Sequence, residues 1–433
     1  MLGILLGLIC LAFLTYKGMS ILWVAPVSAL VVAAFGGMNL LDAFTGDFMK
    51  AFGGYATSWF PMFMLGAIFG KVMEVTGAAE SIAHFLAKKI GYKRAIIAVV
   101  VICGVLTYGG VSLFVVVFVM YPMGLALFRE ANLPRKMLPG SIALGAFAFT
   151  MTAFPGTPQL TNVIPATYFG TGPMSAPVIG IICGILMFIL GILWLQYRTK
   201  KLQAAGEVFD EPEGETTAGV SNPEDLPKWY LAIIPPLLII ILFNAVKLNI
   251  VVALLVGVLA GIIIFIRRLK TFGNVIKTLN DGASGSMLAI LNTAAGVGFG
   301  GVIKAVPGFE QLKTLVTGID ASPLISEAIA INVLAGATGS SSGGVSIVLE
   351  ALGPQFIELA KQSGIALEVF SRVASISAGG LDTLPQCGAV LTVLAVTKLT
   401  HKDSYIDIFM CCTVIPISAT ILAIILGTLG VVQ

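Results

Sequence analysis

The sequence predicts an all-α polytopic membrane protein built from two inverted repeats, and three observations predict it. The chain of 433 residues is 57% hydrophobic and 11% charged, with a mean hydropathy of +0.99, whereas soluble domains carry about 25% charged residues. The tetrapeptide Gly-Gly-Val-Ser occurs at 109–112 and again at 343–346, each time inside a long apolar stretch. A single strongly polar stretch, 198–228, separates the two halves.

The apolar stretches set the expected elements, because an ordinary membrane-spanning helix needs about 20 apolar residues. Four stretches run longer and carry Gly, Pro, Ser or Thr in their interior, as interrupted helices do. Two more segments begin apolar and turn amphipathic, and we expect them to be re-entrant hairpins. The expected spans are 2–16, 20–37, 95–128, 137–168, 176–195, 229–246, 249–266, 323–352, 371–398 and 405–430, and the expected hairpins are 55–90 and 283–317.

The two halves match beyond the tetrapeptide. Phe69-Gly70 corresponds to Phe299-Gly300, and Pro158-Gln159 corresponds to Pro385-Gln386. The offset stays between about 227 and 234 residues, so each half is one repeat unit. Five spans per half is an odd number, which inverts the second repeat relative to the first. The expected organisation is a first transmembrane repeat at 1–197, a polar linker at 198–228 and a second, inverted repeat at 229–433.

Basic residues at the ends of the spans indicate the orientation. A cytoplasmic linker places most of them inside, as the positive-inside rule requires. The cluster Lys88, Lys89, Lys93 and Arg94 then falls on the opposite side. If the two expected hairpins were full spans, each half would cross six times and the inversion would fail.

Two glycine- and hydroxyl-rich breaks are the first candidate binding segments. Glycines let the backbone leave helical geometry, and the N–H groups at the start of the next half-helix attract an anion such as a carboxylate. Hydroxyls can donate to a carboxylate or coordinate a cation. The structural alternative is close helix packing through small residues. The candidate substrate-binding residues in these breaks are Thr107, Tyr108, Gly109, Gly110, Ser112, Thr338, Gly339, Ser340, Ser341, Ser342, Gly343, Gly344 and Ser346.

A second pair of breaks follows, one in each half. Prolines inside an apolar stretch interrupt the helix, and unpaired backbone at membrane depth survives only where it is buried in protein or lines a cavity. Asp382 is an ionisable group inside a predicted span, which makes it our candidate for ion coupling. The alternative is an aspartate that caps the next half-helix. The candidate substrate-binding residues in these breaks are Thr157, Gln159, Thr383 and Gln386.

Asn292 and Thr293, in the second expected hairpin, complete the candidate substrate site, with an interhelical hydrogen bond as the alternative role for Asn292. The sequence contains no metal-ligand cluster, no catalytic triad and no phosphate loop. The six cysteines show no metal or redox spacing. We therefore expect no enzyme activity, no cofactor and no nucleic-acid partner.

These segments carry a resemblance that covers nearly the whole chain. The Gly/Ser-rich break at 338–346, the segment Asn292–Gly296 and the segment Ser377–Gly388 resemble the gluconate permease (GntP) family of the ion transporter superfamily. Two segments depart from the gluconate type. Ser377–Gly388 stands in place of the family's His-Val-Asn-Asp-Ser-Gly, and Phe154–Gln159 in place of a His-Pro-Gly-Pro-like stretch.

The resemblance implies proton-coupled uptake through a bacterial inner membrane, by an elevator-type motion of hairpins and broken helices. Asp382 is retained, but the His and Asn that precede it in the family are absent. This departure favours a smaller, less hydroxylated acid, as in hydroxybutyrate permease-like members. By analogy with elevator-type relatives, we expect a homodimer in the lipid bilayer.

The expected function is proton-coupled symport of a small organic monocarboxylate such as 3-hydroxybutyrate or a gluconate-like sugar acid. A second hypothesis within the same class is a Na⁺-coupled carboxylate symporter, or a cation antiporter in which Thr338, Ser340 and Asp382 bind Na⁺. A hypothesis of another class is a membrane subunit that transports nothing. The inverted repeat argues against this last hypothesis.

Overall fold

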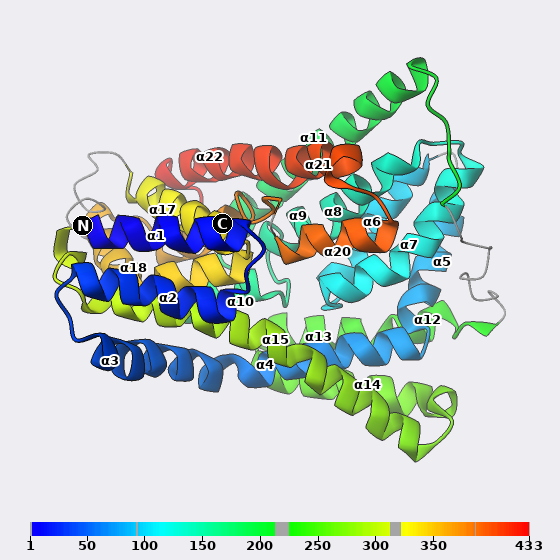
Figure 1. The fold of residues 1–433 in the computed structure, drawn as a ribbon. Helices are drawn as coiled ribbons and strands as arrows, with labels where there is room; N and C mark the ends of the chain where they lie inside the picture. The colour runs from blue at the N-terminus through cyan, green and yellow to red at the C-terminus, as the bar shows by residue number, and fades with distance from the viewer. Residues whose placement is uncertain (1, 92–93, 213–224, 312–321, 386, 433) are drawn as a thin grey trace.

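The computed structural model describes residues 2–91, 94–212, 225–311, 322–385 and 387–432, and these residues form helices and connecting segments without a strand (Figure 1). The first half contains α1 (Leu2–Tyr16), α2 (Ile21–Phe35), α3 (Leu40–Asp42), α4 (Met49–Val75), α5 (Ala78–Ile90), α6 (Ala95–Tyr108), α7 (Leu113–Glu130), α8 (Leu138–Phe147), α9 (Phe149–Thr152), α10 (Leu160–Tyr168) and α11 (Pro177–Ala204). The second half contains α12 (Trp229–Ala232), α13 (Ile234–Asn244), α14 (Ile250–Leu269), α15 (Phe272–Ala305), α17 (Pro323–Thr338), α18 (Ser341–Ser363), α19 (Leu367–Ser377), α20 (Gly388–Thr397), α21 (His401–Phe409) and α22 (Ile415–Thr428).

Several of these helices are long and apolar enough to cross a membrane. By length and composition the described residues contain four such helices: α11, α14, α15 and the continuous segment His401–Thr428 that joins α21 to α22. The pair formed by Leu40–Val75 and α5 passes the same test as one span with a 64° bend. The all-helical, multi-span fold class is therefore confirmed.

The expected hairpin at 283–317 is wrong, because α15 is one helix of 34 residues that runs unbroken through Asn292; residues 312–317 lie outside the described part. Within the other expected hairpin, 55–90, α4 is a helix of 27 residues that continues through Pro61, and the chain bends by 64° after Val75; the hairpin itself stays a prediction. At 1.5 Å per residue, α4 is about 40 Å long, more than the roughly 30 Å of a bilayer's hydrocarbon core.

Hairpins lie at the glycine-rich breaks, where we had expected single interrupted spans at 95–128 and 323–352. Helices α17 and α18 pack against each other after the break. A Cβ atom on Gly344 would lie 2.4 Å from the Cα atom of Ala335, so the two backbones are in direct contact. Helices α6 and α7 also contact each other. Each half thus has a hairpin at its glycine-rich break.

The course of α4 and α5 also changes the expected position of the basic cluster on α5. The Ser81 hydroxyl donates to the Pro227 carbonyl at 2.5 Å, and the rings of Phe85 and Trp229 stack with centroids 3.8 Å apart. Helix α5, with Lys88 and Lys89, therefore lies beside the end of the linker. The sequence-based arrangement put this cluster on the opposite side because it counted 55–90 as a hairpin that does not cross the membrane.

Acidic residues bind the described part of the linker to the start of α8. Lys136 pairs with Glu207 at 2.5 Å, and Arg135 pairs with Asp210 at 2.9 Å. Arg129 and Glu211 are 2.6 Å apart, and the Arg129 guanidinium holds the pKa of the Glu211 carboxyl below its usual value. Helix α11 continues to Ala204, so the predicted linker 198–228 begins as helix.

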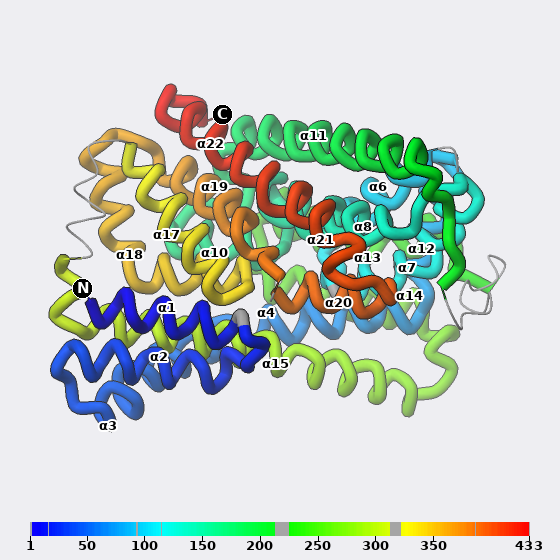
Figure 2. Tube along the Cα trace, turned by 45° about the horizontal axis from the view of Figure 1, so that its top comes forward, coloured from blue at the N-terminus to red at the C-terminus, as the bar shows by residue number. Residues whose placement is uncertain are grey.

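The two broken helices, α8–α10 and α19–α20, meet at their breaks (Figure 2). The Ser375 hydroxyl donates to the Thr152 carbonyl at 2.7 Å. Arg372 of α19 is 1% exposed, and its guanidinium donates to the Ser175 carbonyl at 3.0 Å and to Asn162 Oδ1 at 3.0 Å. It also donates to the Ala153 carbonyl at 3.3 Å. Arg372 thereby satisfies the Ala153 carbonyl at the first break and the Ser175 carbonyl before α11, neither of which has a helical partner among the described residues.

Helices α4 and α15 pack along each other in opposite directions. A Cβ atom on Gly282 would lie 2.7 Å from the Cα atom of Ile68, whereas one on Gly301 would lie 2.5 Å from the Cβ atom of Ala51. The two helices occupy the same position in the order of their halves, and antiparallel packing is what an inverted repeat produces. The repeat boundaries 1–197 and 229–433 stay a prediction.

Gly344→Ala should destabilise the hairpin of α17 and α18, because the added methyl group would overlap the backbone of Ala335. We expect a cost of about 1–3 kcal/mol in the free energy of unfolding, measured as a lower thermal midpoint in detergent. Gly54→Ala on α4 is the matched control, since its Cβ atom meets nothing within 4 Å. Equal midpoints for the two variants would contradict the close contact.

Candidate functional site

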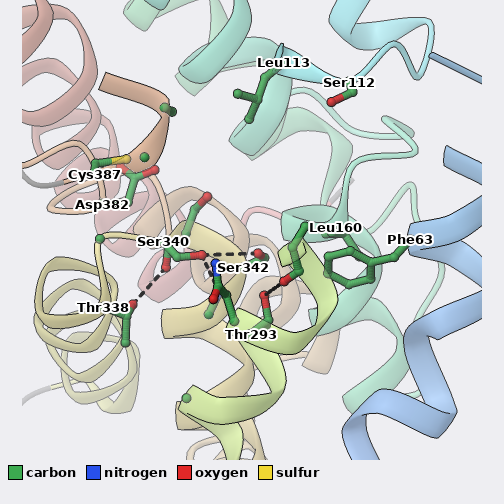
Figure 3. A pocket seen from close by; sticks show the side chains of 18 of the residues that line it. Phe63, Ser112, Leu113, Leu160, Thr293, Thr338, Ser340, Ser342, Asp382 and Cys387 are labelled. Atoms are coloured by element: carbon green, nitrogen blue, oxygen red, sulfur yellow. Dashed lines mark hydrogen bonds between the residues drawn. The ribbon is translucent and has the colours of Figure 1, made fainter. Parts of the chain in front are cut away.

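A cavity of about 470 Å³ lies where the two hairpin tips and the two helix breaks come together. Its remaining walls come from α4, α15 and the segment that joins α1 to α2. Figure 3 shows Ser340 and Ser342 of the second hairpin at its centre, with Asp382 on one side and Ser112 on the other. Cavities of this size hold small ligands.

The tip of the second hairpin consists of a left-handed glycine followed by a capping serine. Gly339 has φ +61°, a conformation that favours glycine and ends α17. The Ser340 hydroxyl accepts from the Gly343 N–H at 3.1 Å and so caps α18. Thr338 donates back to the Leu334 carbonyl at 2.8 Å, which leaves its side chain at the rim of the cavity.

The tip of the first hairpin follows the same plan. Gly110 has φ +86°, and Ser112 precedes the first residue of α7. The Gln159 side chain, from the first helix break, donates to the Thr107 carbonyl at 2.7 Å. This bond connects the break to the hairpin and holds Gln159 beside the cavity.

Five helices begin at residues that line the cavity: α2, α7, α10, α18 and α20. Ser20 and Ser340 cap two of them, whereas the residues preceding the other three, Ser112, Gln159 and Cys387, make no side-chain cap. The described lining residues contain no Lys, Arg or His. Positive potential in the cavity therefore comes from the N-terminal ends of helix dipoles, which attract anions.

Asp382 is the only acidic residue in the described lining and is 3% exposed. Its Oδ1 atom has no hydrogen-bond partner in the described structure, although the carboxylate takes a hydrogen bond from Ser341. On the opposite wall, Asn292 Oδ1 also has no partner there. Both oxygens can therefore accept from a bound donor or hold a cation.

Most of the predicted site residues come together in this cavity. Those that line it are Gly110, Ser112, Gln159, Asn292, Thr293, Thr338, Gly339, Ser340, Ser341, Ser342, Gly343, Asp382 and Thr383. Gln386 lies outside the described residues.

Six predicted residues do not line the cavity. Thr107 and Thr157 are fully buried, Gly344 packs against α17, and the Ser346 hydroxyl faces Tyr55. Tyr108 and Gly109 line a separate, apolar cavity of about 770 Å³ behind the first tip, where the Tyr108 hydroxyl donates to the Pro155 carbonyl at 2.8 Å. A turn points successive residues in different directions, so only part of each motif reaches the cavity.

Sequence reasoning missed the walls that the long helices supply. Met62, Phe63 and Gly66 of α4 line the cavity, as do Gly285 and Ser286 of α15. The signal available was the run of small residues in both segments, which permits close approach of a ligand or another helix. We had assigned these segments to hairpins, and that assignment hid their role as walls.

Comparison with known proteins agrees with this architecture. The structure is similar to that of the Alcanivorax borkumensis YdaH transporter, with a TM-score of 0.58 and 14% sequence identity. The match covers 90% of this chain and 88% of that chain. The similarity supports the fold alone.

Sequence relatives identify the family. The uncharacterized transporter YxjC of Bacillus subtilis is 40% identical, with 94% of each chain covered. The high-affinity gluconate transporter of Escherichia coli is 30% identical over 167 residues, which cover 37% of this chain and 35% of that protein. The model of the GntP family permease matches residues 1–381. The chain therefore belongs to the GntP permease family and is a membrane transporter rather than an enzyme.

Proposed function

We propose that the protein is a proton-coupled symporter for a small organic monocarboxylate such as 3-hydroxybutyrate or a gluconate-like sugar acid. One observation carries the proposal: five helix N-termini meet at a cavity whose described lining contains no basic side chain. Several partial positive charges of this kind suit a single carboxylate. Hydroxyls of Ser112, Ser340 and Ser342 and the Asn292 amide supply donors and acceptors for the rest of the molecule.

Asp382 supports the coupling to a cation. A substrate carboxylate and an ionised Asp382 in one cavity would repel each other strongly, because water screens little at this depth. One proton on Asp382 removes the repulsion and lets the acid and the proton move together. A Na⁺ ion bound among Thr338, Ser340 and Asp382 would have the same effect, and the experiments below distinguish the two.

The arrangement of contacts supports an elevator-type cycle. Helices α1, α2, α4, α14 and α15 form one connected group. The two hairpins, the two broken helices, α11 and α22 form a second group, which meets the first where α15 packs against α18 and α1 against α17. The cavity takes lining residues from both groups, so a displacement of one group against the other would carry the tips and breaks away from α4 and α15.

The relatives bear on the substrate and its setting. The Escherichia coli relative is named a gluconate transporter, which favours an organic acid for this chain too. The relatives in the comparison come from bacteria, and we extend the proposal to a bacterial inner membrane and a homodimer.

Reconstituted wild-type protein should accumulate labelled 3-hydroxybutyrate or gluconate when an inward pH gradient is imposed without Na⁺. Collapse of the gradient should abolish the accumulation. The neutral amide of 3-hydroxybutyrate should compete at least about tenfold less well than the acid, because it forgoes the attraction of the helix N-termini. If accumulation requires Na⁺, then Na⁺ rather than a proton is the coupling ion. If neither acid is taken up, the substrate assignment is overturned.

Asp382→Asn should abolish pH-driven accumulation while the variant still exchanges substrate across the membrane. The amide keeps the size of the carboxyl group but cannot carry the proton. Glu358→Gln, on the exposed end of α18, is the control and should accumulate like wild type. Full accumulation by Asp382→Asn would remove Asp382 from the mechanism.

Ser340→Ala should weaken substrate binding and destabilise the second tip. The substitution removes the cap on Gly343 N–H, at a cost of about 1 kcal/mol, and it deletes a hydroxyl from the cavity. We expect a rise in the half-saturating substrate concentration of up to about tenfold. Ser363→Ala, on an exposed turn of the same helix, is the control, and equal values for the two variants would contradict the binding role of the tip.

A further inference from the structure

Helix α18 carries a polar stripe that leads away from the cavity. Ser342, Ser346 and Glu350 are spaced four residues apart, so their side chains lie on one face of the helix. Ser342 lines the cavity, and Glu350 lies about 12 Å farther along the axis at 1.5 Å per residue. Carboxylates are rare inside membrane helices and usually mark a functional position.

The first part of the stripe is buried against α4. The Ser346 side chain is 0% exposed, and its hydroxyl lies 2.6 Å from the Ser342 carbonyl and 3.2 Å from the Tyr55 hydroxyl. Tyr55 is 4% exposed. A tyrosine hydroxyl thus meets the stripe one turn below the cavity.

The second part reaches the surface of the protein. The Tyr168 hydroxyl, from the end of α10, donates to Glu350 Oε2 at 2.8 Å, and its ring lies against α18 at Gly353. Lys304 of α15 is exposed and donates to the Glu350 carbonyl at 3.4 Å. The carboxylate of Glu350 is therefore half-buried, with solvent close to one side.

Charged groups on α17 and α19, which pack against α18, form no hydrogen bond to Glu350 among the described residues. On α19, Arg372 donates to residues of the first break, and Glu368 is exposed. Glu327 of α17 has no hydrogen-bond partner in the described structure. In the described structure Tyr168 and Lys304 hydrogen-bond to Glu350, and the Tyr55 hydroxyl faces Ser346.

We propose that Glu350 is the group through which the coupling proton passes between the cavity and the protein surface, along the hydroxyls of Tyr168, Tyr55 and Ser346. This inference rests on the proton coupling proposed above. A proton from solvent converts the Glu350 carboxylate to the acid. Each hydroxyl then binds an incoming proton on its oxygen and releases its own, so no charge stays on the tyrosines or the serine. Asp382 is the final acceptor. Transfer between the two tyrosine hydroxyls, and from Ser346 into the cavity, takes place through bridging water.

The path would be open in only part of the transport cycle. Tyr55 belongs to α4, in the first group of helices, whereas Ser346 and Glu350 belong to the second hairpin. An elevator-type displacement breaks the bond between Tyr55 and Ser346 and interrupts the path. Proton access from this side would then close as the cavity moves, which a coupled transporter requires.

The test compares Glu350→Gln, Tyr168→Phe and Tyr55→Phe with wild type in proteoliposomes, using labelled 3-hydroxybutyrate and gluconate. We expect pH-driven uptake to fall at least about tenfold in each variant, with exchange at equal pH on both sides within about twofold of wild type. Glu350→Asp should restore part of the driven uptake and shift its pH profile. Glu358→Gln is the control on the same helix.

Two results would overturn the inference while leaving the proposed function intact. In the first, all three variants keep wild-type driven uptake. In the second, they lose exchange and driven uptake equally, as expected if the hydroxyls only hold α18 against α4 and α10. If wild-type protein itself shows no pH-driven uptake, the proposed coupling fails and the inference fails with it.

Discussion

The whole arrangement depends on one constraint, the cost of unpaired backbone groups at membrane depth. A helix may stop inside the bilayer only where its free N–H and C=O groups find partners or line a cavity. Four interruptions meet this condition together. The hairpin tips at Gly110 and Gly339 open onto the cavity, and the guanidinium of Arg372 satisfies carbonyls beside the first break. The N–H groups left over at the half-helix starts become the anion-attracting surface.

The sequence could not distinguish glycines that break a helix from glycines that let a neighbouring helix pack closely. Gly110 and Gly339 adopt positive φ, and each ends a helix. The glycines of α15 are helical, and their missing side chains admit a neighbour, as at Gly298, where a Cβ atom would lie 2.9 Å from the Phe48 ring. Glycines that break a helix and glycines that admit a neighbour both make a segment rich in small residues. The sequence therefore predicted the fold class and the position of the breaks, but placed the hairpins where the structure has long helices.

Sequence reasoning predicted the cavity residues whose role follows from residue type alone. It missed those whose role depends on the direction in which the side chain points. Asp382 could be predicted, because an ionisable group in an apolar stretch has few structural uses, and the serines of the second tip could be predicted because they follow directly on a glycine break. Ser346, Tyr108 and Thr157 belong to the same motifs but point away from the cavity. The contributions of α4 and the part played by Arg372 depend on contacts between distant segments, which one sequence does not reveal.

The charges of the cavity are the physical basis of the proposed coupling to a cation. Helix dipoles are fixed, so the N-termini of α7, α10, α18 and α20, which belong to one group of helices, keep their attraction for an anion when that group moves. An ionised Asp382 about 4 Å from a carboxylate would oppose that attraction by about 4 kcal/mol at an effective dielectric constant near 20. Asp382 is the one carboxylate in the described lining, so in the proposed cycle its neutralisation would change the cavity from repelling to retaining an acid. Coupling would then follow from electrostatics, because the acid would bind well only when the cation is present.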